Sequence, residues 1–146
     1  MTPDKTTSEL ISDAVHWYRN LRTDFADVDL LLRTQREFAA RLYDFAGEVG
    51  ALYKQRNRTE FQRKAAFARE RQARIAGAGS VAKAESEALV EVEALLNDEQ
   101  QADSEYRAAY LLLEHGRDVL SSMVQHLSHL KQEKRAETYG QGSQSA

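Results

Sequence analysis

The sequence predicts an all-α fold, a long antiparallel helical hairpin of the coiled-coil type with a short N-terminal helix. The first observation is a run of seam positions from Ala88 to Leu130 whose spacing alternates between four and three residues, as in a long helix with one buried face. The second is that glycine is scarce, proline is single, and alternating Val/Ile/Thr runs and Asn-Gly or Asp-Gly turns are missing. The third is one glycine turn, Gly77 to Ser80, at which the chain can fold back.

A short helix is predicted over about residues 7–22. Thr6 and Glu9 have the spacing of a capping box. Apolar residues then recur at helical spacing: Leu10, Ile11, Ala14, Trp17, Tyr18 and Leu21. Thr23-Asp24 resembles a second N-cap, which favours a break near residue 23, although an unbroken helix stays an alternative.

The first long helix is predicted over about residues 24–75. Its seam positions are Val28, Leu31, Gln35, Phe38, Leu42, Phe45, Val49 and Leu52. The next large apolar residue, Phe61, does not fit the alternation, so we expect the seam to shift phase there. The shifted positions would be Phe61, Ala65, Ala68, Gln72 and Ile75.

The turn is predicted at residues 76–80, and the second long helix at about residues 81–137. Folding the chain at Gly79 aligns the two seams, with Phe45 opposite Leu113 and Leu42 opposite Gly116. The glycine opposite a leucine suggests a close approach of the two helices. We expect residues 1–137 to form a single domain and residues 138–146, which are rich in Gly, Ser and Gln, to be a disordered tail.

The charges form two blocks on either side of the turn. Residues 54–74 carry a net charge of +6 and residues 75–105 carry −7. In the folded hairpin these blocks face each other, so Arg56 is expected near Glu99 and Asp103, and Arg63 near Asp98 and Glu91.

The second long helix has apolar residues beside its seam, which a two-helix hairpin does not need. The extra width predicts a further packed helix or a second copy of the chain, and a homodimer is the expected assembly. The N-terminal helix is long enough to cover only the part around residues 112–130. With the two aromatic residues of that helix, the expected partner face is Trp17, Tyr18, Leu89, Leu96, Tyr110, Leu112, Val119 and Val124.

The basic segment 54–74 is the one feature that indicates a ligand. An aromatic ring among cations is typical of a contact with single-stranded nucleic acid or another anionic partner. The candidate residues are Arg63, Lys64, Phe67, Arg71 and Arg74. The competing interpretation is that these cations neutralise the acidic helix opposite them.

No motif indicates catalysis. Cysteine is absent, and we find no nucleophile elbow and no phosphate-binding glycine loop. His126 and His129 are three residues apart, but further metal ligands at suitable spacing are missing. We therefore expect no enzyme activity, no cofactor, no metal and no small-molecule substrate. The apolar stretches are too short to span a bilayer, and a cytoplasmic protein that does not contact membranes is expected.

Two segments resemble small uncharacterised helical proteins of phage and prophage early regions, some of which lie near recombination genes. The first runs from Val119 and Leu120 through Met123 and His126 to Leu130 and Glu133, and the second is the turn from Gly79 to Glu85. The resemblance covers about residues 54–135 and implies a viral accessory protein that acts with DNA-processing proteins. It assigns no functional residues.

The sequence thus favours a non-enzymatic interaction or scaffold protein that binds itself and a further protein. The alternative is an accessory protein of DNA recombination or replication that binds nucleic acid through the basic segment 54–74.

Overall fold

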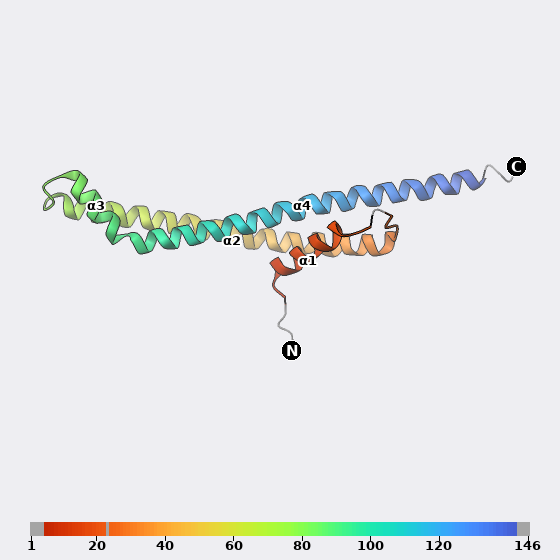
Figure 1. Ribbon diagram of the computed structural model, residues 1–146, viewed down its shortest axis with the longest axis horizontal. Coiled ribbons are helices and arrows are strands. Elements are labelled where there is room, and N and C mark those ends of the chain that lie inside the picture. Colours follow the sequence, from red (N-terminus) through yellow and green to blue (C-terminus); the bar gives the residue numbers. More distant parts are fainter. Residues whose placement is uncertain (1–4, 23, 143–146) are drawn as a thin grey trace. The chain divides into compact units, whose positions relative to one another are not determined.

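The computed structural model describes residues 5–22 and 24–142, with side chains as far as residue 140. Four helices, and no strands, make up its regular structure over these residues: α1 (Thr7–Arg19), α2 (Val28–Ile75), α3 (Val81–Glu91) and α4 (Glu93–Gly142). The long helices α2 and α4 pack against each other in opposite directions (Figure 1). The predicted all-α helical hairpin is therefore confirmed.

The chain forms two compact units that share these long helices. Unit 1 contains the described residues up to Gly47 and from Leu111 onward, and unit 2 contains Glu48–Tyr110. Unit 1 therefore holds α1 with one half of α2 and of α4, whereas unit 2 holds the other halves with the turn and α3.

Unit 1 has an apolar core. Its seam side chains are buried on both long helices: Leu31, Phe38, Leu42 and Phe45 on α2, and Leu113, Met123, Leu127 and Leu130 on α4. The predicted close approach is present, because a Cβ atom added to Gly116 would lie 2.5 Å from Cδ2 of Leu42 and 3.6 Å from Cγ2 of Ile11. Because Gly116 has no side chain, α1 and α2 can both pack closely against α4 at this position.

Helix α1 starts at the predicted capping box. The backbone N–H of Thr6 donates to Glu9 Oε2 at 2.8 Å, and the Glu9 N–H donates to Thr6 Oγ1 at 3.3 Å. The chain then breaks between α1 and α2, as favoured. The N-cap of α2 is Asp27, which accepts from the Leu30 N–H at 2.9 Å, rather than Thr23-Asp24. Thr23 itself lies outside the described residues.

The predicted phase shift in α2 is wrong. The seam continues past Leu52 at unchanged spacing through Arg56, Thr59 and Arg63, where Thr59 is buried and the two arginines are largely covered. Phe61 is 73% exposed and points away from the seam. Polar residues can occupy these seam positions because Arg56 and Arg63 pair with carboxylates of the opposite helix.

The turn and the second arm differ in detail from expectation. Gly79 adopts φ +73°, the left-handed conformation that glycine favours, and Ser80 Oγ caps α3 by accepting from the Lys83 N–H at 3.2 Å. The predicted helix 81–137 is interrupted at Val92, where α3 and α4 change direction (Figure 1). Helix α4 continues to Gly142, so residues 138–142 of the predicted tail are helical, and residues 143–146 lie outside the described residues.

Candidate functional site

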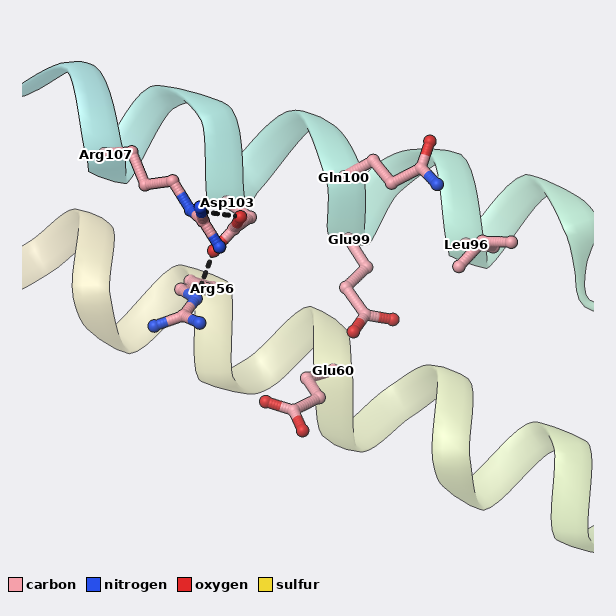
Figure 2. A pocket seen from close by; sticks show the side chains of 7 residues that line it. All are labelled: Arg56, Glu60, Leu96, Glu99, Gln100, Asp103 and Arg107. Atoms are coloured by element: carbon pink, nitrogen blue, oxygen red, sulfur yellow. Dashed lines mark ion pairs between the residues drawn. The ribbon is translucent and has the colours of Figure 1, made fainter.

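The strongest concentration of charge lies in the seam of unit 2. Figure 2 shows Arg56 of α2 and Arg107 of α4 converging on Asp103. The Asp103 carboxylate lies 2.6 Å from Arg56 Nε and 2.7 Å from Arg107 Nε. Its Oδ1 atom is buried and pairs with Arg56 by charge without hydrogen-bond geometry. The contact between Arg56 and Asp103 is one of those that the sequence predicted.

The next pair along the seam is Arg63 with Glu99, rather than with the predicted Asp98 or Glu91. Nearer the turn, Arg71 Nε lies 2.8 Å from Glu85, and Arg74 contacts Glu91 at 3.1 Å. Arg74 also contacts Glu87 at 3.5 Å and Glu70 at 3.4 Å. Partial desolvation lowers the pKa of Arg74, but its three carboxylate partners outweigh this effect, and the pKa is raised.

The four basic candidates for nucleic-acid contact all have carboxylate partners, three on the opposite arm and one on α2 itself. Arg63, Arg71 and Arg74 have carboxylate partners on α3 or α4. Lys64 pairs with Glu60 one turn away on its own helix, and the hydrogen bond from Lys64 lowers the pKa of Glu60. Phe67 is half-buried instead of standing exposed among the cations. Nucleic-acid binding by this set stays a prediction.

The expected partner face separates into two sides of α4. In unit 1, Leu112 is half-buried and Val119 is buried, and α1 lies along this side. Its position is given by Ile11 beside Gly116 and by the Tyr18 ring 6.3 Å from that of His126. Burial raises the pKa of Tyr18, and Trp17 packs edge-on against Phe25 at 6.2 Å. The expectation that the N-terminal helix covers residues around 112–130 is confirmed.

The remaining residues of the expected partner face are exposed, on the side of the seam opposite α1: Leu89, Leu96, Tyr110 and Val124. Leu96, Tyr110 and Val124 of α4 are separated by multiples of seven residues, so they share one helix position, and Leu89 of α3 precedes Leu96 by seven residues across the interruption at Val92. In unit 2 the same side of the pair carries Tyr53 and Phe67 of α2, again at a multiple of seven. We call this set in unit 2 the aromatic side: Tyr53, Phe67, Leu89, Leu96 and Tyr110.

A tyrosine cluster at one end of the aromatic side was not predicted from the sequence. The ring centroid of Tyr106 lies 5.5 Å from that of Tyr53 and 5.9 Å from that of Tyr110, and the Arg56 guanidinium lies over Tyr106 at 5.5 Å. The sequence did contain a signal for this cluster. Arg56 continues the seam spacing of α2, and Tyr53 lies three residues before it, on the same side of the helix. A hollow of about 280 Å³ beside the cluster is lined by one leucine and six polar or charged residues: Leu96, Arg56, Glu60, Glu99, Gln100, Asp103 and Arg107 (Figure 2).

The opposite side of unit 2 is polar. A hollow of about 260 Å³ there is lined by Gln55, Gln62, Asp98 and Glu105, with Thr59 and Ala102 at its base. The exposed leucine and tyrosine side chains therefore distinguish the aromatic side, although both sides also carry charged groups, and such exposed side chains favour a contact with a partner there.

Within the described part of the chain, no group of three or more His, Asp or Glu side chains is arranged to hold a metal. His126 instead contacts the Phe25 carbonyl at 3.2 Å, and His129 lies 3.3 Å from Glu133. None of the helices over these residues is both long and apolar enough to cross a membrane.

In comparisons with known proteins, no family model, no curated protein and no solved structure matches the chain.

Proposed function

We propose that the chain is a non-enzymatic, cytoplasmic interaction protein that associates with a second copy of itself through the aromatic side of unit 2. The observation that supports this proposal is the contrast between the two sides of the α2–α4 pair. Leucine and tyrosine side chains are exposed on the aromatic side, beside a hollow lined mostly by charged side chains, whereas glutamine and carboxylate side chains line the hollow on the other side. Exposed apolar rows on a helix pair are typical of contacts with further helices.

A second copy fits this surface because the surface is self-complementary. If two α3–α4 arms pack antiparallel about a two-fold axis near Gln100, Leu89 of each copy meets Tyr110 of the other. Leu96 then lies at the level of Asp103, whose carboxylate is neutralised by Arg56 and Arg107 of its own chain. The same axis brings the exposed Glu93 of each copy to the exposed Arg107 of the other. A two-fold contact requires such matching of a surface with itself, in apolar residues and in charge.

The test is the molar mass of the full chain, measured by light scattering at two protein concentrations. Wild type is expected to form a dimer that dissociates on dilution. Leu89→Glu combined with Leu96→Glu is expected to be monomeric, because the change places four carboxylates in the contact. Leu30→Glu is the matched control, since Leu30 is 40% exposed and Leu96 is 37% exposed, and it should leave the dimer intact.

A charge reversal tests the orientation of the two copies. Glu93→Arg is expected to weaken the dimer, because it places a cation opposite Arg107 of the other copy and leaves the Arg107–Asp103 pair within each chain intact. A monomer at every concentration, or a dimer insensitive to the substitutions at Leu89, Leu96 and Glu93, would refute the proposal.

A further inference from the structure

We propose that the outward face of α2 in unit 2 binds single-stranded nucleic acid, with the Phe61 ring stacking on a base. We define this outward face by its exposed residues Lys54, Arg58, Phe61, Lys64 and Arg69. Phe61 is 73% exposed, although the sequence pattern led us to expect it in the seam. The proposal is independent of self-association, because Phe61 lies on the far side of α2 from the seam.

The cations of the basic segment differ in their partners. Arg56, Arg63, Arg71 and Arg74 point to carboxylates of α3 and α4. Lys64 pairs with Glu60 of its own helix. By contrast, among residues 5–22 and 24–142 no carboxylate forms an ion pair with Lys54, Arg58 or Arg69. The approximate cancellation of charge between the two blocks therefore conceals a face on which positive charge stays free.

The carboxylate at the edge of this face is Glu60, which is paired with Lys64. The two acidic residues of segment 54–74 are Glu60 and Glu70, and both are turned partly toward the helix opposite. The exposed residues between the cations are Asn57, Gln62, Ala68 and Gln72, which are neutral. Apart from Glu60, which Lys64 neutralises, an anionic strand would therefore meet neutral or basic side chains along this face.

The spacing along the helix suits a polynucleotide. At about 1.5 Å per residue, Lys54, Arg58, Lys64 and Arg69 span roughly 22 Å, with steps of about 6 to 9 Å between neighbouring cations. Phe61 lies between Arg58 and Lys64, one turn from each. An exposed ring flanked by cations supplies a stacking platform together with phosphate contacts, which is how proteins bind single strands without reading their sequence.

An acidic peptide is the competing ligand, and the structure favours it less. A peptide needs a recess for its apolar side chains, but around Phe61 the residues one turn away are Asn57, Arg58, Lys64 and Ala65 on a convex helix surface. A base requires only the flat face of the ring.

The experiment measures binding of the full chain to fluorescently labelled fifteen-nucleotide oligo(dT) by anisotropy, at several salt concentrations. Phe61→Ala is expected to weaken binding by about tenfold or more. The matched control is Tyr43→Ala, because Tyr43 is an 83% exposed aromatic residue of the same helix whose neighbours one turn away are Ala39, Ala40, Ala46 and Gly47. This control is expected to bind like wild type.

Charge removal provides the second measurement. Arg58→Gln and Arg69→Gln are each expected to reduce the slope of log K against log salt by about 0.7, the value for one phosphate contact on a single strand. Arg71→Gln is the control, because Arg71 is already paired with Glu85, and it should leave the slope unchanged.

Three outcomes would overturn the proposal. The first is equal binding by Phe61→Ala and Tyr43→Ala. The second is duplex DNA binding as tightly as the single strand, which would show that stacking is not involved. The third is binding of polyglutamate with no binding of oligo(dT), which would show that the face takes an acidic protein. Light scattering on the same variants separates any of these results from a loss of self-association.

Discussion

The two units use the same helix pairing but different cores. In unit 1 the facing positions are Phe38, Leu42, Phe45 and Leu113, and a third helix packs beside them. In unit 2 the facing positions are Arg56, Thr59, Arg63 and Glu99, and the buried apolar residues are mostly small: Val49, Ala84, Ala88, Val92 and Ala102. Apolar burial stabilises folded proteins, whereas partly buried ion pairs contribute little net stability and mainly select one pairing. We infer that unit 1 stabilises the hairpin and that unit 2 fixes its register.

The largest effect is expected from the core of unit 1. Phe38 is 1% exposed, and Phe38→Ala should lower the free energy of unfolding by about 3–5 kcal/mol through lost burial and the cavity left behind. Urea denaturation followed by circular dichroism measures the change. Tyr43→Ala, on the exposed face of the same helix, should stay within about 0.5 kcal/mol of wild type. Equal losses in the two variants would remove the distinction between core and surface.

A smaller effect is expected when one partner of a seam ion pair in unit 2 is removed. The side chains of Arg63 and Glu99 are 22% and 20% exposed. Arg63→Met leaves the Glu99 carboxylate partly buried without its partner and should cost about 2–3 kcal/mol. Arg63→Met combined with Glu99→Leu should return the midpoint of urea unfolding close to that of wild type. A double variant no better than the single one would contradict the idea that the pair selects register more than it stabilises.

The close approach in unit 1 gives a pair of substitutions with opposite signs. Gly116→Leu forces a side chain against Leu42 and Ile11 and should destabilise by about 1–2 kcal/mol, after the gain in helix propensity. Gly50→Ala, where no atom lies within 4 Å of the added Cβ, should stabilise by about 0.5–1 kcal/mol. Thermal melting temperatures that shift in the same direction for both variants would show that α4 does not approach α2 at Gly116.

The smallest effect concerns pH and the N-terminus of α1. The backbone N–H of Thr6 lowers the pKa of the Glu9 carboxyl below its usual value of 4.5. Because the folded pKa is the lower one, this stabilisation is complete above pH 4.5 and is lost as pH falls through the folded pKa. NMR titration of the Glu9 carboxyl carbon should give a value below 4.5, and Thr6→Ala, which removes the hydroxyl donor but keeps the backbone N–H, should raise it in part. A wild-type pKa of 4.5 or higher would mean that the capping box does not form in solution.

Much of unit 1 was predictable from the sequence, because its seam is apolar and periodic. The spacing of Leu31, Phe38, Leu42 and Phe45 predicted the buried face, and Gly116 predicted the point of close approach. Unit 2 was predicted less well, because a search for large apolar residues moved the seam to Phe61. The alternation of three and four residues continued through Arg56, Thr59 and Arg63, but their polarity concealed it.

The two candidate surfaces were also only partly predictable from the sequence. Leu89, Leu96 and Tyr110 were predicted only as part of one flank that also contained Leu112 and Val119, which the structure places on the other side of α4. The division of the basic segment into paired and outward-facing cations was not predicted. The net charge of a segment does not distinguish Arg63, which points inward, from Arg58, which points outward. Only the positions of the carboxylates opposite made that distinction.

The central claim is that an apolar unit 1 stabilises the hairpin and that a less stable unit 2 presents the proposed binding surfaces. Native-state hydrogen exchange tests this claim most directly. In dilute protein, the account predicts that amides of residues 31–45 and 113–130 exchange only through global unfolding, while those of residues 52–75 and 84–106 exchange through smaller openings. At higher concentration, residues 84–106 should gain protection as copies associate. Equal protection of both units in the dilute monomer would contradict the account.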